Sequence, residues 1–208
     1  MTVETAGALG RYFETLYTLN QNIIVLCGAD IFDHVIEFER RVDEVVTSIP
    51  RLVPYSYNHK AAGYEIIPSD GLMKFSQDLP FLGGEYEKIL QKHVDFLEKV
   101  KKVRNKLEHE IHGAQIVASS SGNTSFFSVV YSISEQRIEL RAREIIDFVE
   151  DMNILFSKLQ NLAKQFAYDH KYDGHPYFRR LIRYDFTDFN RIFESDLLHT
   201  FGKTLQPF

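Results

Sequence analysis

Apolar residues recur at helical spacing along three long stretches of this chain. The first runs from Leu9 to Ile23, the second from Phe32 to Ile49, and the third and most regular from Ala142 to Tyr168. Intervals of three and four residues place side chains on one face of an α-helix. The pattern therefore predicts three amphipathic helices, of which the first two could pack as an antiparallel pair.

A further long helix is predicted from about Glu85 to Gly113. At about 100° per residue, its apolar residues form one broad stripe, and Arg104 projects from the middle of it. The stripe consists of Tyr86, Ile89, Leu90, His93, Leu97, Val100, Leu107 and Ile111. A guanidinium cannot lose its proton to ease burial, so Arg104 must face a carboxylate, a phosphate or a water-filled cleft. The polar residues that border the same stripe are Lys101, Asn105, His109 and His112.

The segments between these helices have a different composition. Residues 50–84 contain Pro54, Pro68, Pro80 and a pair of glycines, which predicts irregular structure. The polar run from Ser119 to Thr124, followed by β-prone residues 126–133, predicts a hairpin or a mobile loop. A shorter helix is expected near Thr187 to Thr200.

Four long helices that each have one apolar face predict an all-α fold, because these faces must be buried against one another. We expect an up-and-down bundle of four to five helices, with a short β-hairpin or loop insertion after the helix that carries Arg104. The length suffices for one sizeable core, and no linker divides it. The prediction is a single domain over residues 1–208.

Composition favours a soluble, cytoplasmic protein. The chain has 208 residues, of which 44% are hydrophobic and 25% are charged. No apolar run approaches the ~18 residues of a membrane span, and the first residues lack the basic and apolar segments of an export signal. Cys27 is the single cysteine, which excludes an internal disulfide and a multi-cysteine zinc site.

The net charge of −5 excludes a globally basic nucleic-acid binder, so any RNA contact must be local. Residues 88–106 form one local basic group, with seven basic and two acidic residues. A second group places arginines next to aromatic rings, a mixture that suits phosphates and bases. It consists of Tyr177, Phe178, Arg179, Arg180, Arg183 and Tyr184. Either group can equally be the solvated rim of packed structure.

Arg104 and His109 have four residues between them in one predicted helix. An ion pair of Arg104 with Glu108, and a boundary position for His109, would explain both without a function. The segment Arg104-Asn105-Lys106-Leu107-Glu108-His109 resembles the Arg-x4-6-His motif of the HEPN superfamily, small all-α domains found in many prokaryotic ribonuclease toxins and defence proteins. Asn105 fills the position after the arginine where the family favours a small polar residue. Ile111 stands where some members carry a tyrosine that can be modified, so that control is not implied.

The resemblance implies a metal-independent endoribonuclease without a cofactor, with Arg104, Asn105 and His109 as its candidate catalytic residues. The ribose 2′-OH attacks the phosphate, so the enzyme need only move protons and stabilise charge. His109 would act as base or acid, Arg104 would hold the phosphate oxygens, and Asn105 would orient the phosphate or the histidine. Because family members pair two motifs across a dimer, a homodimer is expected. A toxin–antitoxin or antiviral defence role, with an antitoxin or regulatory protein as partner, is also implied.

Two alternatives stay open. The chain could be a non-catalytic helical module that binds a protein or a nucleotide, with Arg104 paired to an acid. It could also bind a metal, although His109 and His112 lack a third ligand at a telling spacing. A loose cluster of further potential ligands consists of Asp169, His170, Asp173 and His175. The sequence holds no Gly-rich phosphate loop or nucleophile elbow, which excludes the common nucleotide hydrolases and esterases.

Overall fold

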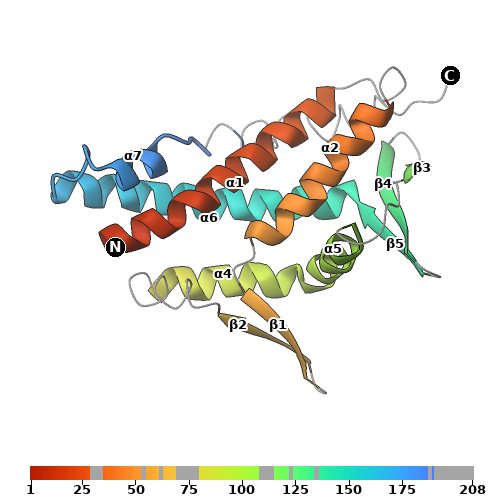
Figure 1. Cartoon of the computed structure of the whole chain (residues 1–208), viewed down its shortest axis with the longest axis horizontal. Helices are drawn as coiled ribbons and strands as arrows, with labels where there is room; N and C mark the ends of the chain where they lie inside the picture. Colours follow the sequence, from red (N-terminus) through yellow and green to blue (C-terminus); the bar gives the residue numbers. More distant parts are fainter. Residues whose placement is uncertain are drawn as a thin grey trace.

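The computed structural model shows a mainly helical chain with two small antiparallel sheets (Figure 1). The residues that the structure describes are 1–28, 35–52, 55–60, 63–68, 80–107, 115–121, 124–133, 136–186 and 189. Among the described helices, none combines the length and the apolarity needed to cross a membrane. The prediction of a mainly helical fold is confirmed.

The three most regular apolar stretches all form helices. Helix α1 spans Val3–Gly28, α2 spans Val35–Ser48 and continues as the 3-10 turn η1 at Ile49–Leu52, and α6 spans Ala142–Asp169. Helix α1 packs against α2, η1 and α6, and α2 runs back along it as the predicted antiparallel partner (Figure 1). The short helix α7, Pro176–Ile182, was not predicted and packs against both α1 and α6.

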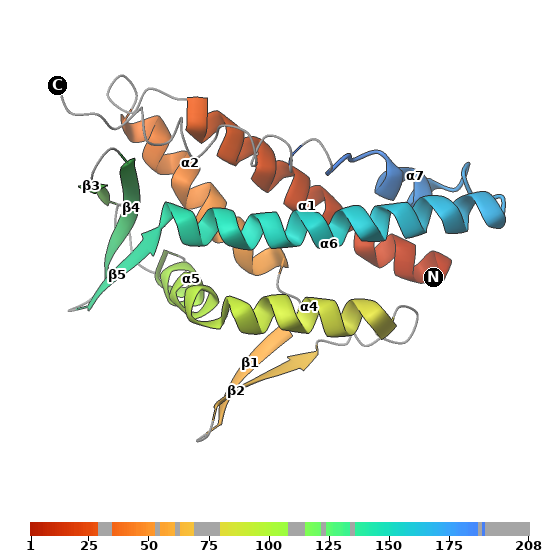
Figure 2. The ribbon, with the colours of Figure 1, turned by 180° about the vertical axis from the view of Figure 1, so that it is seen from behind.

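The helix predicted from Glu85 to Gly113 is instead two helices. Helix α4 spans Pro80–Lys92 and α5 spans Val94–Leu107, and Figure 2 shows the chain changing direction between them, at His93. The prediction of one continuous helix is wrong. The sequence gives no sign of the break, because the junction contains neither proline nor glycine and leaves the apolar spacing intact. The predicted end of this helix, residues 108–113, lies outside the described part of the chain.

Among the described residues, five strands form two separate sheets. Their bounds are β1 Tyr55–Lys60, β2 Gly63–Pro68, β3 Gln115–Ser121, β4 Thr124–Ile133 and β5 Gln136–Arg141. The hairpin predicted after the helix with Arg104 is confirmed as β3 and β4, and the unpredicted β5 extends it to a sheet of order β3-β4-β5. The expectation of irregular structure over residues 50–84 is wrong where β1 pairs with β2, because the prolines there flank or end the strands.

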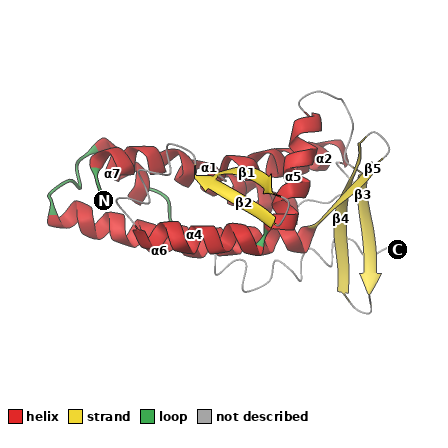
Figure 3. Ribbon diagram, turned by 90° about the horizontal axis from the view of Figure 1, so that it is seen from below, coloured by secondary structure: helices red, strands yellow, loops and turns green. Residues whose placement is uncertain are grey.

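Strand β5 runs directly into α6. Arg141 is the last residue of β5 and the N-cap of α6, and its backbone N–H donates to the Glu144 carboxylate at 2.9 Å. Along β5, Ile138 and Leu140 are buried and their neighbours are exposed. Figure 3 shows this sheet at one end of the molecule and α7 at the other. The sheet therefore covers the core at the end where α6 begins.

An aromatic cluster joins α1, α6 and the segment after α7. The ring of Phe13 in α1 lies 5.0 Å from that of Phe156 in α6 and 5.3 Å from that of Phe186, between centroids. Phe186 and Phe189 are both buried, so the chain after α7 completes the core. The helix predicted near Thr187 to Thr200 lies, apart from Phe189, outside the described residues.

The C-terminal end of α6 has the hydrogen bonds of a Schellman motif, with a lysine where glycine is usual. Tyr172 N–H donates to Ala167 O at 2.7 Å, and Lys171 N–H donates to Tyr168 O at 3.2 Å. Lys171 has a φ of 57°, in the left-handed region. For a residue with a Cβ this conformation costs about 1–2 kcal/mol. The motif offsets that cost by satisfying helix carbonyls and by packing Tyr172 against Phe166, with ring centroids 6.3 Å apart.

Two asparagines form a reciprocal pair in the core. Asn20 of α1 and Asn153 of α6 are fully buried, and each side-chain amide donates to the Oδ1 of the other at 2.8 Å. Asn20 also donates to Leu16 O at 2.8 Å. An unpaired amide in the core would cost free energy. The pair therefore favours a single alignment of α1 along α6.

We predict that Asn20→Leu and Asn153→Leu each lower the free energy of unfolding by about 1–3 kcal/mol, because each leaves the other amide buried without its partner. The double variant should lose less than the sum of the two, since two leucines of similar volume can pack together. Urea unfolding measures all three. The matched control is Asn161→Leu at an exposed position of α6, which should change stability by under about 0.5 kcal/mol. Additive losses would contradict the pairing.

Candidate functional site

Arg104 lies in the last turn of α5, and its side chain is exposed. The buried residues among the described side chains of α5 are Phe96, Leu97, Val100 and Val103. At about 100° per residue, Arg104 lies on the same face of the helix, between Val100 and Leu97 and one turn beyond Val100. The predicted place of Arg104 on the apolar face therefore agrees with the structure, and its side chain is exposed at the end of the helix.

The other two candidate catalytic residues are only partly placed. Asn105 follows Arg104 in α5, where the backbone alone is described. His109 lies outside the described residues, as do Glu108 and His112. The grouping of Arg104 with His109, and the competing ion pair with Glu108, therefore stay predictions.

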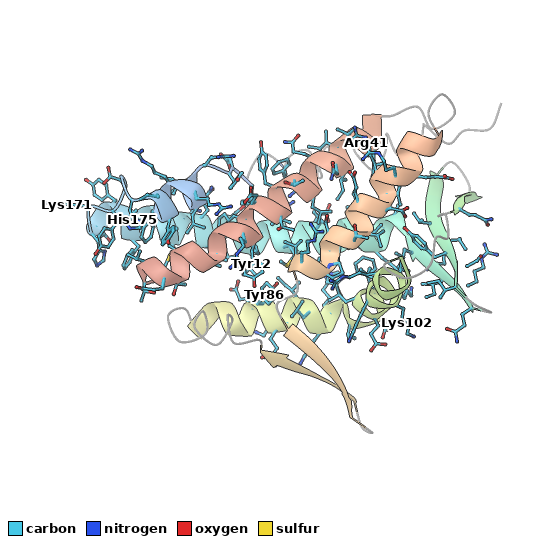
Figure 4. The ribbon with its side chains drawn as sticks, viewed as in Figure 1. Tyr12, Arg41, Tyr86, Lys102, Lys171 and His175 are labelled. Atoms are coloured by element: carbon cyan, nitrogen blue, oxygen red, sulfur yellow. The ribbon has the colours of Figure 1, made fainter. Side chains whose placement is uncertain are left out.

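The basic run of residues 88–106 is partly neutralised by acids of α6. Lys92 Nζ donates to Asp151 Oδ2 at 2.6 Å, and Lys99 Nζ donates to Glu144 Oε1 at 2.8 Å. Lys102 is exposed on α5 and labelled in Figure 4. Further exposed basic side chains, Lys101, Lys102 and Arg104, lie in the last two turns of α5.

A buried histidine marks the junction of α4 and α5. The His93 side chain is 8% exposed, and its Nε2 lies 2.7 Å from Asp151 Oδ2 of α6. Its ring meets Phe148 edge-on, with centroids 5.5 Å apart. Sequence reasoning counted His93 as part of an apolar stripe and missed this contact, because the partner acid is 58 residues away. The available signal was the histidine itself, a polar group on an otherwise apolar face.

Asp151 has a lowered pKa, although burial acts in the opposite direction. Burial raises the pKa of this carboxyl, but hydrogen bonds from Lys92 and His93 and the charges of both outweigh it. Asp151 is therefore held ionised, as an anchor for two residues of another helix. Because little of the His93 ring is exposed, we assign this pair to positioning α5 and not to acid–base chemistry on a substrate.

A second buried polar pair joins α2 to the sheet. The Tyr131 hydroxyl of β4 donates to Asp43 Oδ1 of α2 at 2.8 Å. Burial raises the pKa of Asp43 despite this bond, and burial beside Asp43 raises the pKa of Tyr131 above its ordinary value of 10.0. The pair ties β4 of the sheet to α2.

His170 and His175, two of the candidate metal ligands, each make a local structural contact instead. His170 stacks on Phe166 with centroids 4.0 Å apart, and its Nδ1 lies 3.0 Å from Phe166 O. His175 is the N-cap of α7, where its Nδ1 accepts from Tyr177 N–H at 3.3 Å. Within the described ranges, no three His, Cys, Asp or Glu side chains are grouped to hold a metal ion. The alternative of a metal site at Asp169, His170, Asp173 and His175 is therefore not supported.

In comparisons with protein-family models, with curated proteins and with solved structures, the chain matches none of them. The functional argument therefore rests on the residues and their geometry. Two exposed regions carry it: the last turns of α5 around Arg104, and the aromatic and basic end formed by α6 and α7.

We predict that Asp151→Asn lowers the free energy of unfolding at neutral pH by about 1–3 kcal/mol, the range for losing hydrogen bonds to a charged group. Because the folded pKa of Asp151 lies below its ordinary value of 3.8, its contribution is present above that pH and is lost as pH falls through the folded pKa. Denaturant unfolding between neutral and acid pH measures this. Wild type should lose more stability on acidification than the variant.

The control for this experiment is Asp147→Asn, one turn earlier in α6, where the acid pairs with Arg143 at 2.7 Å on a more exposed surface. Such pairs contribute little, so the control should keep the stability and the acid sensitivity of the wild type. If Asp151→Asn lost as much stability on acidification as wild type and Asp147→Asn do, Asp151 would not anchor the α4–α5 junction.

Proposed function

We propose that this chain is a metal-independent endoribonuclease of HEPN type, which cleaves RNA through attack of the ribose 2′-OH. The observation that supports it most is the exposed Arg104 in the last turn of α5, beside the exposed Lys101 and Lys102. A guanidinium at such a position can grip a phosphate with its planar fork. His109 follows two residues after the end of α5, close enough in sequence to act on the same phosphate.

The proposed reaction needs four protein groups: two histidines, an arginine and an asparagine. His109 takes the proton from the 2′-OH, and the resulting alkoxide attacks phosphorus. The bond from phosphorus to the 5′-oxygen breaks, and a protonated histidine returns a proton to that oxygen. Arg104 stabilises the charge on the non-bridging oxygens, and Asn105 orients the phosphate. The products are a 2′,3′-cyclic phosphate and a free 5′-hydroxyl.

One histidine cannot easily serve as base and acid in the same event, so we infer a homodimer that brings two motifs together. We further propose that the helices form one up-and-down bundle domain and that the protein acts in the cytoplasm, on cellular or foreign RNA. A toxin or antiphage role, restrained by an antitoxin or regulatory protein, would suit such an activity.

A non-catalytic binding module is the second candidate, and one observation favours it. Lys92 and Lys99 form ion pairs with acids of α6, as expected for basic residues that stabilise helix packing. In that case Arg104 would dock a protein or a nucleotide without cleaving anything.

We predict that Arg104→Ala and His109→Ala each reduce RNA cleavage by roughly two to four orders of magnitude, the effect of losing a charge-stabilising or acid–base group. Cleavage should persist in EDTA and stop when the scissile ribose is replaced by deoxyribose, because the attacking oxygen is then missing. Gel analysis of a labelled RNA, with mass spectrometry of the ends, measures rate and product. Arg104→Lys should restore little activity, since an ammonium lacks the fork.

Arg137→Ala is the matched control, because this arginine is exposed on β5, outside α5, and has no role in the proposed reaction. It should leave the cleavage step nearly unchanged. Cleavage of DNA, or activity that EDTA abolishes and a divalent ion restores, would contradict the mechanism. Absence of cleavage with wild type would favour the binding module.

We also predict that the protein is a homodimer at micromolar concentration, with the two Arg104 side chains facing a shared cleft. Light scattering should give twice the mass of one chain. Mixing inactive Arg104→Ala and His109→Ala subunits provides the functional check, because a cleft that draws groups from both chains can regain activity in the mixed dimer. A strictly monomeric active particle would remove the two-histidine mechanism and leave His112 as the nearest substitute.

A further inference from the structure

Four aromatic rings stack nearly parallel where α6 ends and α7 begins. The ring centroids of His170 and Phe166 are 4.0 Å apart, with an angle of 20° between the ring planes. Those of Tyr172 and Phe178 are 5.8 Å apart, with an angle of 15°. The two pairs are also nearly parallel to each other, since His170 and Tyr172 differ by 14°. Phe178 is fully buried, whereas Tyr172 is 38% exposed. A flat aromatic face is therefore held at the surface by rings anchored in the core.

The backbone holds this face rigid. The Schellman hydrogen bonds at the end of α6 fix Lys171 and Tyr172, and the next turn is closed by His175 N–H donating to Tyr172 O at 2.8 Å. The His175 side chain then caps α7, and its ring meets Tyr177 with centroids 5.2 Å apart. A ligand that stacks here would not have to order a loop first, which lowers the entropic cost of binding.

Exposed basic side chains lie in the same segment of the chain. Lys171, Arg179 and Arg183 are exposed, and Lys171 and His175 lie at one end of the molecule in Figure 4. Residues 165–183 hold four basic residues and two acidic ones, Asp169 and Asp173, in a chain whose net charge is −5. Arg180 is paired with Glu14 of α1, and Arg183 lies over the Tyr184 ring at 5.0 Å. The small excess of positive charge in this segment therefore comes from the arginines at α7.

Lys171 occupies its position at a cost to the fold. Its left-handed φ of 57° is one that glycine adopts without strain. Its side chain is exposed, so the lysine does not compensate by burial. A strained residue beside an aromatic face indicates a function for its charge.

We propose that this region, the stacking surface of His170, Lys171, Tyr172, Tyr177 and Arg179, binds single-stranded RNA. An unpaired base would stack on the exposed ring of Tyr172 or His170, and Lys171 and Arg179 would contact the adjacent phosphates. A phosphopeptide would use the charges and leave the flat rings unused. Tyrosine and basic side chains also suit a membrane interface, but a lipid surface has no flat ring on which parallel aromatic side chains could stack. The proposal rests on the proposed function in one respect: it names a second contact for the RNA that the enzyme would cut.

The stacking surface is far from Arg104. Helix α6 has 28 residues and is therefore about 40 Å long at 1.5 Å per residue. Its first turn is tied to α5 through the bond of Lys99 to Glu144, and the stacking surface lies at its other end. A six-nucleotide RNA with stacked bases is about 20 Å long at ~3.4 Å per nucleotide, about half the length of α6. Short RNA therefore tests the stacking surface separately from the cleavage site.

The experiment is fluorescence anisotropy with the full chain and a labelled six-nucleotide 2′-O-methyl RNA, which cannot be cleaved. Tyr172→Ala should weaken Kd by about 5- to 100-fold, the effect of one stacked base, whereas Tyr172→Phe should stay within about twofold of wild type. Lys171→Gly should raise Tm by about 2–4 °C as strain is relieved. The same variant should weaken binding and lower the slope of log Kd against log salt by about 0.7.

Arg137→Ala on β5 is the control and should bind the short RNA as wild type does. A duplex of the same sequence should bind more weakly, because its bases are not free to stack. Unchanged affinity in Tyr172→Ala, equal affinity for the duplex, or binding to anionic vesicles in place of RNA would overturn the proposal. An unchanged salt slope in Lys171→Gly would overturn the phosphate contact.

The two proposals fail separately. If the short RNA binds and depends on Tyr172, but no longer RNA is cleaved, the stacking surface stands and the nuclease function falls. If RNA is cleaved in a manner that depends on Arg104 and His109, while Tyr172→Ala binds as wild type does, the stacking surface alone is wrong.

Discussion

The reciprocal amide pair of Asn20 and Asn153 fixes how the two longest described helices lie against each other. Apolar burial is not directional, so the aromatic contacts between α1 and α6 would tolerate a sliding movement. The amides would not, because a shift of one turn leaves two polar groups unpaired in the core. The position of α7 follows from this alignment, since it packs on both helices at once.

Helix α6 also determines the direction of the helix that carries Arg104. Asp151 and Glu144 contact the α4–α5 junction and the first turns of α5 through His93 and Lys99. The junction is thus held from outside by charged hydrogen bonds, without any feature of its own that would force a bend. The polar residues near the junction hold α4 and α5 to α6, and exposed basic residues lie at the end of α5.

Helical periodicity located α1, α2 and α6 because each buries one face over many turns, and it could not detect features that depend on distant or unusual partners. The bend at His93, where the histidine contacts Asp151 far away in sequence, leaves the apolar spacing intact, so periodicity predicted one helix where there are two. The cap at Lys171 escaped notice because sequence rules look for glycine there. Within the candidate site, the structure places Arg104 in the last turn of α5 with an exposed side chain. The position of His109 is not among the described residues, so its pairing with Arg104 is still a prediction.

Arg141 belongs to both β5 and α6, so the strand and the helix share a residue with no spacer between them. The inward residues of β5 alternate with outward ones, and α6 turns by about 100° with every residue. Adding or removing one residue at Arg141 would either exchange the two faces of β5 or rotate α6 by about 100° relative to the strand. This junction should therefore be the point of the chain least tolerant of a change in length. Because no flexible segment separates β5 from α6, a rotation of the sheet is expected to be transmitted to α6 as a rotation of the whole helix.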